Sequence, residues 1–404
     1  MISYVDALEL ILSLPVVTRI EAIPLQDSYG RVLAGPVAAS WPLPRFDNSS
    51  MDGFAVRAAD IAPDGSLPIV GESAAGRGFG GSLPPRAAIR ISTGAQVPYG
   101  ADSVIPKEAA PESTPDRMHL AQTEVLKVGQ YLRKKGSDVA IGEIIATAGS
   151  VIGSELLALL SSFNISRISV VKRPKAAILT SGDEIKPLGG VLREGDIIGS
   201  SIYYLRNELE ACGCEVRDFG ISTDDPADFR QRYEDALAWG DLVVTTAGVS
   251  VGDHDVVGSA ISDLGMTVHF WKVAVRPGKP MLLASKGGKV HFGLPGNPVS
   301  TCCNTEIFVK PYLRRIMGIE PAQAPLQKMR LTAPARPDPS RLFFLNAKWR
   351  LNDGIAIVEP LDNQNSGNLL NPSKGNALIV LPPGNEIVPE GDSVAVIMLH
   401  SGLT

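Results

Sequence analysis

The sequence predicts a multidomain chain in which a mostly parallel α/β sheet is flanked by β-rich regions. Apolar runs of strand length alternate with helical patterns between Pro174 and Met317, and such alternation favours parallel strands with helices on both faces. On either side, short apolar runs are separated by glycines and prolines, as in β structure with long loops. The length of 404 residues allows roughly two to four domains.

The N-terminal part is predicted to start with a helix and to continue as β structure. Ser3 can cap this helix, Asp6 lies in its first turn, and Pro15 ends its apolar period, which is the usual set of helix signals. The punctuated β pattern runs from about residue 41 to residue 149. A second helix is expected at 155–162 and a strand at 168–171.

The central region is predicted to alternate strands and helices. Strands are expected at 176–179, 215–219, 242–244, 281–284 and 290–292, and helices at 201–211, 226–239, 256–264 and 299–317. Gly213 ends the first of these helices, and Asp224 or Asp225 would cap the second. After a linker-like stretch at 321–325, β structure is expected again at 330–331, 355–358, 377–381 and 394–399.

The composition argues against several classes of protein. A net charge of −5 does not suit a dedicated nucleic-acid binder, since no basic stripe would supply affinity for phosphates. The apolar runs are too short to span a bilayer, and Asp6 and Glu9 stand where a secretory signal needs positive charge. The cysteines lack zinc-type spacing and make a poor disulfide framework: Cys212, Cys214, Cys302 and Cys303. We expect a reduced, soluble, cytoplasmic protein.

The stretch from residue 241 to residue 255 is the strongest indication of a functional site. A short buried strand is followed there by two glycines, a serine and two aspartates: Gly248, Ser250, Gly252, Asp253 and Asp255. Glycines let a backbone approach a ligand, and successive N–H groups can bind an anion. Because carboxylates repel phosphates, a divalent cation such as Mg²⁺ would have to lie between them. A polar turn whose aspartate caps the next helix explains the segment equally well.

Two other predicted strands end in loops of similar chemistry, at 180–184 and 293–298. In an open parallel sheet, ligands bind beyond the carboxyl ends of the strands, so the three loops are expected to line one rim. Capping could explain any one loop, but hardly all three. The sequence therefore predicts a phosphate-and-metal site at this rim.

Other motifs are more ambiguous. Lys272, Arg276 and Lys279 lie near a proline-stiffened turn and form either an oxyanion clamp or a solvated face. The polar loops at 47–53 and 92–95 are interpreted as turns. Gly-x-Ser-x-Gly at 248–252 matches a hydrolase elbow, but the two aspartates after it would oppose an oxyanion.

Seven short motifs occur in a fixed order: Asn48-Ser-Ser-Met-Asp-Gly-Phe, Thr93-Gly-Ala, Gly100-Ala-Asp, Ser181-Gly-Asp-Glu, Gly248-Val-Ser-Val-Gly-Asp-His-Asp, Pro277-Gly-Lys-Pro and Gly293-Leu-Pro-Gly-Asn-Pro. Over essentially its full length, the chain closely resembles the MoeA family of molybdopterin molybdenumtransferases, to which the C-terminal part of gephyrin is related. The resemblance implies four domains: a discontinuous linker domain (1–44 plus 146–173), a β-rich inserted domain (45–145), a MoaB/Mog-like molybdopterin-binding α/β domain (174–320) and a C-terminal β-barrel-like domain (326–404).

The resemblance also implies a reaction and an assembly. Molybdate would be inserted into adenylylated molybdopterin with release of AMP, and Mg²⁺ would be required. The active cleft of a homodimer would join the α/β domain of one subunit to the second and fourth domains of the other. The molybdopterin adenylyltransferase and the cofactor-accepting enzymes would be partners, and no nucleic acid or membrane would be bound. Two alternatives are a non-catalytic molybdopterin-binding scaffold and a molybdopterin adenylyltransferase.

Residue roles are implied by the same resemblance. The catalytic groups would be Glu184, Asp253, Asp52, Thr93 and Lys279. The metal would be held by Glu184, Asp225, Asp253 and Asp255. The substrates would be bound by Ser181, Gly182, Gly248, Ser250, Gly252, Lys272, Arg276, Gly293, Pro295, Gly296, Asn297, Pro298, Asp138 and Ser366. The chain departs from the family pattern at Ala247, Ser137 and Arg276, where glycine, glutamate and lysine are usual. Alanine at 247 adds a Cβ where a glycine could take a positive φ.

Overall fold

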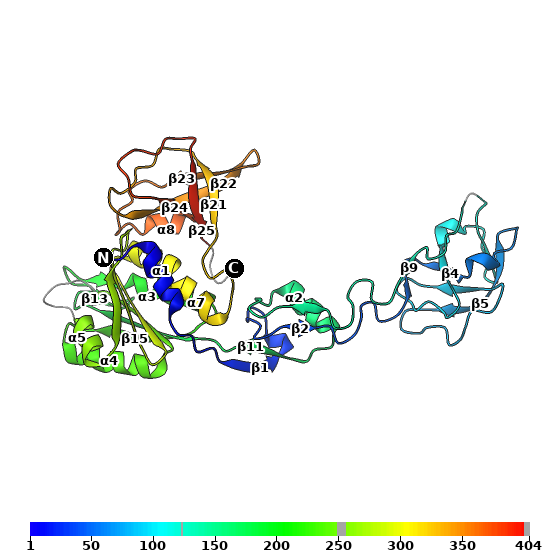
Figure 1. Ribbon diagram of the computed structural model, residues 1–404, viewed down its shortest axis with the longest axis horizontal. Coiled ribbons are helices and arrows are strands. Elements are labelled where there is room, and N and C mark those ends of the chain that lie inside the picture. Colours follow the sequence, from blue (N-terminus) through cyan, green and yellow to red (C-terminus); the bar gives the residue numbers. More distant parts are fainter. Residues whose placement is uncertain (123, 249–255, 400–404) are drawn as a thin grey trace. The chain divides into compact units, whose positions relative to one another are not determined.

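The computed structural model describes residues 1–122, 124–248 and 256–399. The chain divides into two compact units (Figure 1). The first unit comprises Met1–Gly35, Ala148–Leu157 and Ser166–Thr404, and the second comprises Pro36–Thr147 and Ala158–Ile165. The finer division into four domains stays a prediction.

The centre of the first unit is a six-stranded sheet in the order β15-β12-β16-β20-β19-β17. Four parallel strands come first: β15 (Glu215–Ser222), β12 (Lys175–Ser181), β16 (Leu242–Thr246) and β20 (Lys289–Leu294). The edge is antiparallel, with β19 (Pro280–Lys286) and β17 (Thr267–Lys272). All five residues of β16 are buried, as expected for a parallel strand covered on both faces. The predicted α/β fold class is thus confirmed.

Helices cover both faces of this sheet (Figure 1). Ile178 of β12 packs with Leu205 and Leu209 of one layer, whereas Leu179 packs with Phe229 and Tyr233 of the other, because successive side chains of a strand point to opposite faces. The first layer holds α1 (Tyr4–Ser13), α3 (Ser200–Ala211), α6 (Pro298–Asn304), η4 (Thr305–Val309) and α7 (Lys310–Met317), and the second holds α4 (Pro226–Trp239) and α5 (Val256–Asp263).

The helix signals in the sequence act as predicted. The side-chain oxygen of Ser3 accepts a hydrogen bond from the Asp6 N–H at 3.1 Å, and Asp225 accepts one from the Ala227 N–H at 3.0 Å. Residues 299–317, predicted as one α-helix, instead contain the π-helical segment η4. The strand β17 was not predicted because it is an edge strand, and its partly exposed, mixed side chains give no apolar run.

The C-terminal part of the first unit is a closed five-stranded barrel. Its strands, in order around the barrel, are β22 (Leu342–Asn352), β23 (Ile355–Pro360), β21 (Leu326–Leu331), β25 (Ser393–Met398) and β24 (Ala377–Leu381), which pairs again with β22. Closure leaves no free sheet edge. The predicted barrel is confirmed, although β22 and the short helix α8 (Leu370–Lys374) were not predicted.

One short strand ties the barrel to the α/β part. β18 (Val275–Arg276) pairs in parallel with the start of β22, where Arg276 faces Phe343.

Two short strand pairs complete the first unit. β1 (Ile20–Pro24) pairs with β11 (Arg167–Val171), and β13 (Ile185–Lys186) pairs with β14 (Ile197–Ile198). The strand predicted at 168–171 is therefore present, and the turn η1 (Leu25–Asp27) follows β1. Helix α2 (Ser154–Ser162) matches the second predicted helix.

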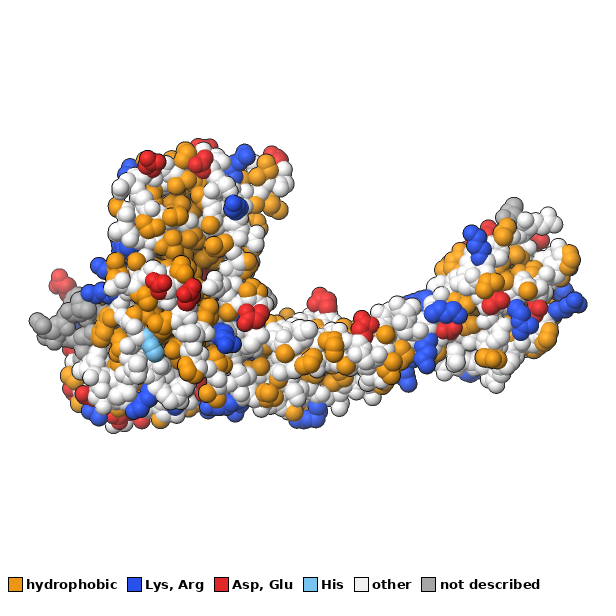
Figure 2. Space-filling model, in the orientation of Figure 1, with side chains coloured by type: hydrophobic (Ala, Val, Ile, Leu, Met, Phe, Trp, Pro, Cys, Tyr) orange, Lys and Arg blue, Asp and Glu red, His pale blue; other side chains and the backbone are white. Residues whose placement is uncertain are grey.

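The second unit is β-rich, as predicted. Its main sheet has the order β7-β4-β6-β5-β8, with β7 (Ser103–Pro106), β4 (Gly53–Val56), β6 (Ala88–Ile91), β5 (Ser66–Ser73) and β8 (Arg117–His119). Two small pairs accompany it, β2 (Val37–Ala38) with β10 (Ile144–Ala146) and β3 (Asn48–Ser49) with β9 (Leu132–Arg133). Two 3-10 turns complete it, η2 (Ala58–Asp60) and η3 (Lys107–Ala109). On the drawn face, acidic and basic side chains are interspersed (Figure 2).

The structure describes the state of the cysteines and the length of the helices. All four cysteines are free thiols, and Cys212, Cys214 and Cys303 are buried among hydrophobic side chains. Within the described ranges, no helix has the length and apolar character needed to cross a membrane.

Candidate active site

The carboxyl ends of three parallel strands lie at one level. Thr180 of β12 pairs with Thr246 of β16, which pairs with Leu294 of β20. The loops that follow therefore begin side by side, at Gly182, Ala247 and Pro295. We call these loops, with the loop after β15, the strand-end rim (residues 182–184, 223–225, 247–248 and 295–298). The predicted juxtaposition of the three loops is thus confirmed where they are described, and a phosphate-and-metal site there stays a prediction. Ser250, Gly252, Asp253 and Asp255 lie outside the described residues.

Hydrogen bonds hold the rim together. The hydroxyls of Thr180 and Thr246 lie 2.8 Å apart. The Gly182 N–H donates to the Ser222 carbonyl at 3.2 Å, and the Asp224 N–H donates to the Asp183 carboxylate at 3.2 Å. The loop after β15, which contains the predicted cap and metal ligand Asp225, is therefore joined to the loop after β12.

Glu184 and Asp225 are the described carboxylates of the predicted metal set, and both are exposed on this rim. Gly182 has φ +137°, and a Cβ added there would lie 2.6 Å from Oε2 of Glu184. The Glu184 carboxylate thus lies directly over a backbone that only glycine leaves open. Asp225 also caps α4 through Oδ1. Among residues 1–122, 124–248 and 256–399, no group of three or more His, Cys, Asp or Glu side chains is placed to hold a metal ion.

Ala247 has a left-handed backbone conformation. Its φ is +65°, and that of Gly248 is +62°. A Cβ on Gly296 would lie 3.2 Å from the Cβ of Ala247, so these two residues pack closely. The sequence departure at this position therefore places a strained alanine in the rim.

Replacing Ala247 with glycine is expected to raise the free energy of unfolding by up to about 1.5 kcal/mol. A left-handed alanine costs about 1–2 kcal/mol, and the greater freedom of glycine in the unfolded chain offsets about 0.5–1 kcal/mol of the gain. The urea midpoint measures this change. Gly296→Ala should destabilise the wild type more than the Ala247→Gly variant, because only the wild type has the opposing Cβ. A lower urea midpoint for Ala247→Gly than for the wild type would contradict the backbone strain inferred at Ala247.

The loop after β20 differs in part from the prediction. Gly293, expected in the loop, lies inside β20, where it pairs with Thr245 and Leu282. The Pro295 carbonyl accepts a hydrogen bond from the Thr301 hydroxyl at 2.7 Å, and Pro298 is the first residue of α6. Gly296 and Asn297 are thus the exposed residues of this loop.

A cavity of about 660 Å³ adjoins the rim at Asn297. We call it the basic pocket, because its lining includes three cationic side chains and no carboxylate among the described residues: Arg276, Pro277, Gly278, Lys279, Pro280, Asn297, Ser300, Arg341, Asn363, Gln364, Asn365 and Ser366. The Asn297 amide donates to the Ser366 hydroxyl at 3.2 Å. Ser366 therefore reaches the pocket from the barrel of the same chain, without a partner subunit. Ser300 and Arg341 were missed, because neither belongs to a recognisable motif.

The predicted basic cluster is divided by the structure. Arg276 and Lys279 line the basic pocket. Lys272 lies at the end of β17 and lines a separate hollow with residues 1–3 and Asp6. Although Lys272 pairs with Pro280, the neighbour of Lys279, the three cations do not line one common cavity of the described residues.

In the second unit, the predicted polar residues form two anchored carboxylates. Asp52 accepts hydrogen bonds from the Thr93 N–H at 2.7 Å and from the Thr93 hydroxyl at 2.8 Å. These bonds lower the pKa of Asp52. Asp138 forms an ion pair with Arg133 and accepts a hydrogen bond from the Ser137 hydroxyl at 3.0 Å.

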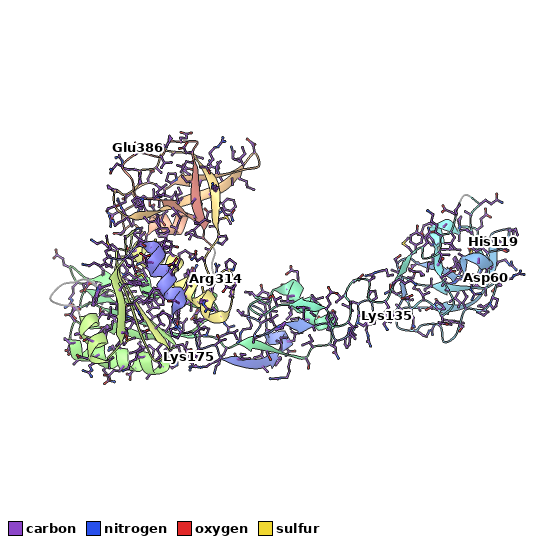
Figure 3. All side chains as sticks on the ribbon, viewed as in Figure 1. Asp60, His119, Lys135, Lys175, Arg314 and Glu386 are labelled. Carbon is purple, nitrogen blue, oxygen red and sulfur yellow. The ribbon has the colours of Figure 1, made fainter. Side chains whose placement is uncertain are left out.

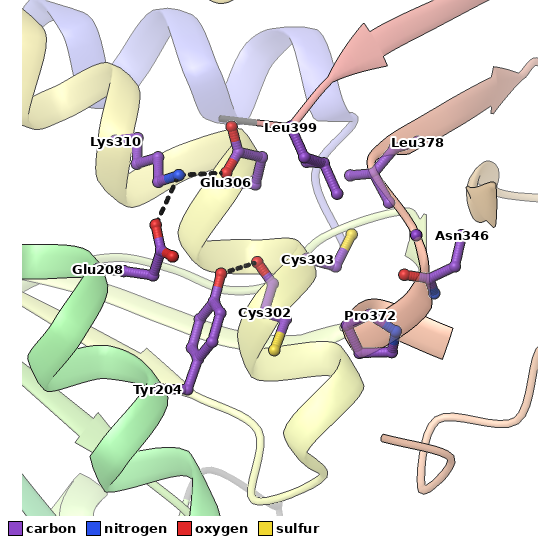
Figure 4. Close-up of a pocket in the computed structure, with 11 residues that line it drawn as sticks. Tyr204, Glu208, Cys302, Cys303, Glu306, Lys310, Asn346, Pro372, Leu378 and Leu399 are labelled. Atoms are coloured by element: carbon purple, nitrogen blue, oxygen red, sulfur yellow. Dashed lines mark hydrogen bonds and ion pairs between the residues drawn. The ribbon is translucent and has the colours of Figure 1, made fainter. Parts of the chain in front are cut away.

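A second cavity, of about 150 Å³, lies between α3, the α6–α7 segment and the barrel (Figure 4). None of the predicted site residues lines it. Its thiols belong to Cys302 and Cys303, and burial raises the pKa of Cys302 to about 12 and that of Cys303 still further. Protonated thiols are poor nucleophiles, so the surroundings do not activate these two cysteines.

Three family models match successive parts of the chain. Residues 2–164 match the MoeA N-terminal region (domain I and II), residues 177–315 match a probable molybdopterin binding domain, and residues 328–399 match the MoeA C-terminal region (domain IV). The similarity therefore includes both flanking regions as well as the α/β part.

Individual relatives align over nearly the whole chain. A molybdopterin molybdenumtransferase of Nostoc sp. is 33% identical over 389 residues, which cover 94% of this chain and 88% of the relative. That of Haemophilus influenzae is 32% identical over 385 residues and 95% of each chain. The crystal structure of a molybdopterin biosynthesis MoeA protein from Pyrococcus horikoshii has a TM-score of 0.84 and 29% identity, over 98% of this chain and 99% of that chain.

Proposed function

The chain belongs to the MoeA family, and on this premise we propose that it inserts molybdate into adenylylated molybdopterin and releases AMP. It is a transferase of molybdenum cofactor biosynthesis. One observation supports the specific reaction more than any other. Asn297 belongs both to the strand-end rim and to the lining of the basic pocket, so a site for a phosphate-bearing substrate directly adjoins a cationic pocket for a second oxyanion.

The chemistry requires charge neutralisation more than a covalent intermediate. A phosphoanhydride must be cleaved while molybdate is held nearby, and the opposing negative charges are best stabilised by fixed cations. Arg276, Lys279 and Arg341 supply them in the pocket. The backbone of the rim, opened by Gly182 and Gly248, would hold the pterin phosphate.

The carboxylates of the rim fit a magnesium ion. Mg²⁺ is commonly bound by one or two protein carboxylates together with waters and substrate phosphates. Glu184 and the second oxygen of Asp225 are exposed for this purpose, and Asp253 and Asp255 come later in the sequence, outside the described residues. The ion would neutralise charge on the substrate phosphates, while the protein carboxylates would orient it.

We further infer that the enzyme is a homodimer with a cleft between subunits. Asp52, Thr93 and Asp138 would then reach the rim from a partner subunit. The bonds from Thr93 lower the pKa of Asp52 and fix its orientation, which suits a group that orients a bound cation or water. The substrate would come from a molybdopterin adenylyltransferase, and the product would pass to cofactor-accepting enzymes.

The test is to incubate the purified protein with adenylylated molybdopterin, Mg²⁺ and molybdate. AMP release that depends on both Mg²⁺ and molybdate, together with metal incorporation, is the expected result. Substrate binding without AMP release would instead identify a scaffold. Adenylylation of free molybdopterin by ATP would identify an adenylyltransferase, an outcome that the two flanking regions disfavour.

A further inference from the structure

Behind the basic pocket lies a buried carboxylate that is not part of the lining. Asp338 is 3% exposed. Its Oδ1 accepts hydrogen bonds from the N–H groups of Ser340 and Arg341, both at 3.0 Å, and from the Ser340 hydroxyl at 3.3 Å. The loop before β22 therefore fixes the orientation of this carboxylate.

Both arginines of the pocket bind Asp338. Arg341 forms a forked pair with it, from Nε to Oδ1 at 3.3 Å and from Nη2 to Oδ2 at 2.7 Å. The Nη1 of Arg276 reaches Oδ2 at 3.4 Å, and the guanidinium of Arg276 lies 4.4 Å from the centroid of the Phe343 ring. Since a guanidinium has five N–H donors, each arginine keeps donors for a ligand in the pocket.

Asp338 also sets the charge of the pocket. Arg276, Lys279 and Arg341 carry three positive charges, of which Asp338 cancels one. Burial opposes ionisation of Asp338, but hydrogen bonds from Arg341 and Ser340 outweigh burial and hold its pKa well below the usual range. The pocket and its buried carboxylate thus retain two positive charges at neutral pH.

We propose that Asp338 is the positioning residue of the basic pocket, and that it makes the pocket selective for a tetrahedral dianion such as molybdate over pyrophosphate. The proposal rests on the proposed function for the identity of the oxyanion. It divides the binding tasks: the dianion takes the basic pocket, and the substrate phosphates take the strand-end rim. Two arginines that approach each other need a shared counter-charge, and Asp338 is the carboxylate that both contact.

The test compares Asp338→Asn with the wild type by direct titration of sulfate, molybdate and pyrophosphate. Asparagine keeps an oxygen for the N–H groups of Ser340 and Arg341 but removes the negative charge. The more highly charged pyrophosphate should then gain about tenfold in affinity relative to sulfate, as expected for one extra unit charge a few ångströms away. In the AMP-release assay, kcat should fall by about tenfold because the arginines are no longer held in place.

Two further variants make the result decisive. Asp353→Asn is the matched control, because it makes the same chemical change on an exposed hairpin of the barrel, and it should leave the anion ratio unchanged. Arg276→Gln lowers the positive charge of the pocket, so it should raise the affinity for sulfate relative to that for pyrophosphate. This variant replaces Asp338→Asn in the test if Asp338→Asn does not fold. Unchanged anion ratios in Asp338→Asn or Arg276→Gln would overturn the proposal. Anion titration measures binding without any reaction, whereas the AMP-release assay tests the proposed function. A failure of the one is therefore distinguishable from a failure of the other.

Discussion

Glu184→Gln is expected to slow AMP release by about a thousandfold, and Asp253→Asn is expected to do the same. Loss of a carboxylate that holds and orients the cation removes several kcal/mol of charge stabilisation in the transition state, and about 4 kcal/mol corresponds to this factor. The substitution at Glu184 preserves the side-chain shape, and this carboxylate is exposed on the rim, so the fold should be retained. Single-turnover AMP release measures the loss of rate, and a thermal melt measures whether the fold is retained.

The control for this prediction is Glu194→Gln, which changes an exposed carboxylate outside the rim and should leave the rate unaltered. Near wild-type rates in both Glu184→Gln and Asp253→Asn would refute the metal-site assignment.

Co-expression of Glu184→Gln with Asp52→Asn tests whether the active cleft is shared between subunits. Mixed dimers would contain one intact site, so roughly a quarter of the wild-type activity should return with random assortment of subunits.

Lys310→Met is expected to lower the free energy of unfolding by about 3–5 kcal/mol, the usual range for breaking a buried ion pair. Lys310 is 5% exposed, and its Nζ lies 2.6 Å from Glu306 and 2.8 Å from Glu208 (Figure 4). Arg314 lies one turn further along the same helix (Figure 3). Methionine would leave two largely buried carboxylates without their lysine, and urea unfolding measures the loss.

The destabilisation should depend on pH. Burial already raises the pKa of Glu306, and removal of Lys310 would raise it further. An acid whose pKa is higher in the folded than in the unfolded state loses stability as the pH rises above its unfolded value. Lys310→Met should therefore be more harmful at pH 8 than at pH 5. Lys328→Met, on an exposed position of β21, is the control, and a wild-type midpoint for Lys310→Met at pH 8 would contradict the prediction.

Local sequence signals predicted much of the α/β part. The cap at Ser3, the cap at Asp225 and the apolar run of β16 each depend on a few neighbouring residues. They can therefore be predicted without knowledge of the fold. The rim could also be predicted, because parallel strands that follow one another bring their carboxyl ends to the same edge. The edge strand β17 and the barrel strand β22 were missed, since their stability depends on pairing with distant segments.

The sequence by itself determined the alternating α/β core, the polar strand-end loops and the family, because these depend on residue type and spacing along the chain. Only the tertiary structure decided which cations share a pocket. It separated Lys272 from Arg276 and brought Arg341 and Asp338 to Arg276 across more than sixty positions of sequence. The physical reason is that charge complementarity acts through space, so the partner of a buried charge is set by how β18 docks on β22 and not by neighbours in the chain.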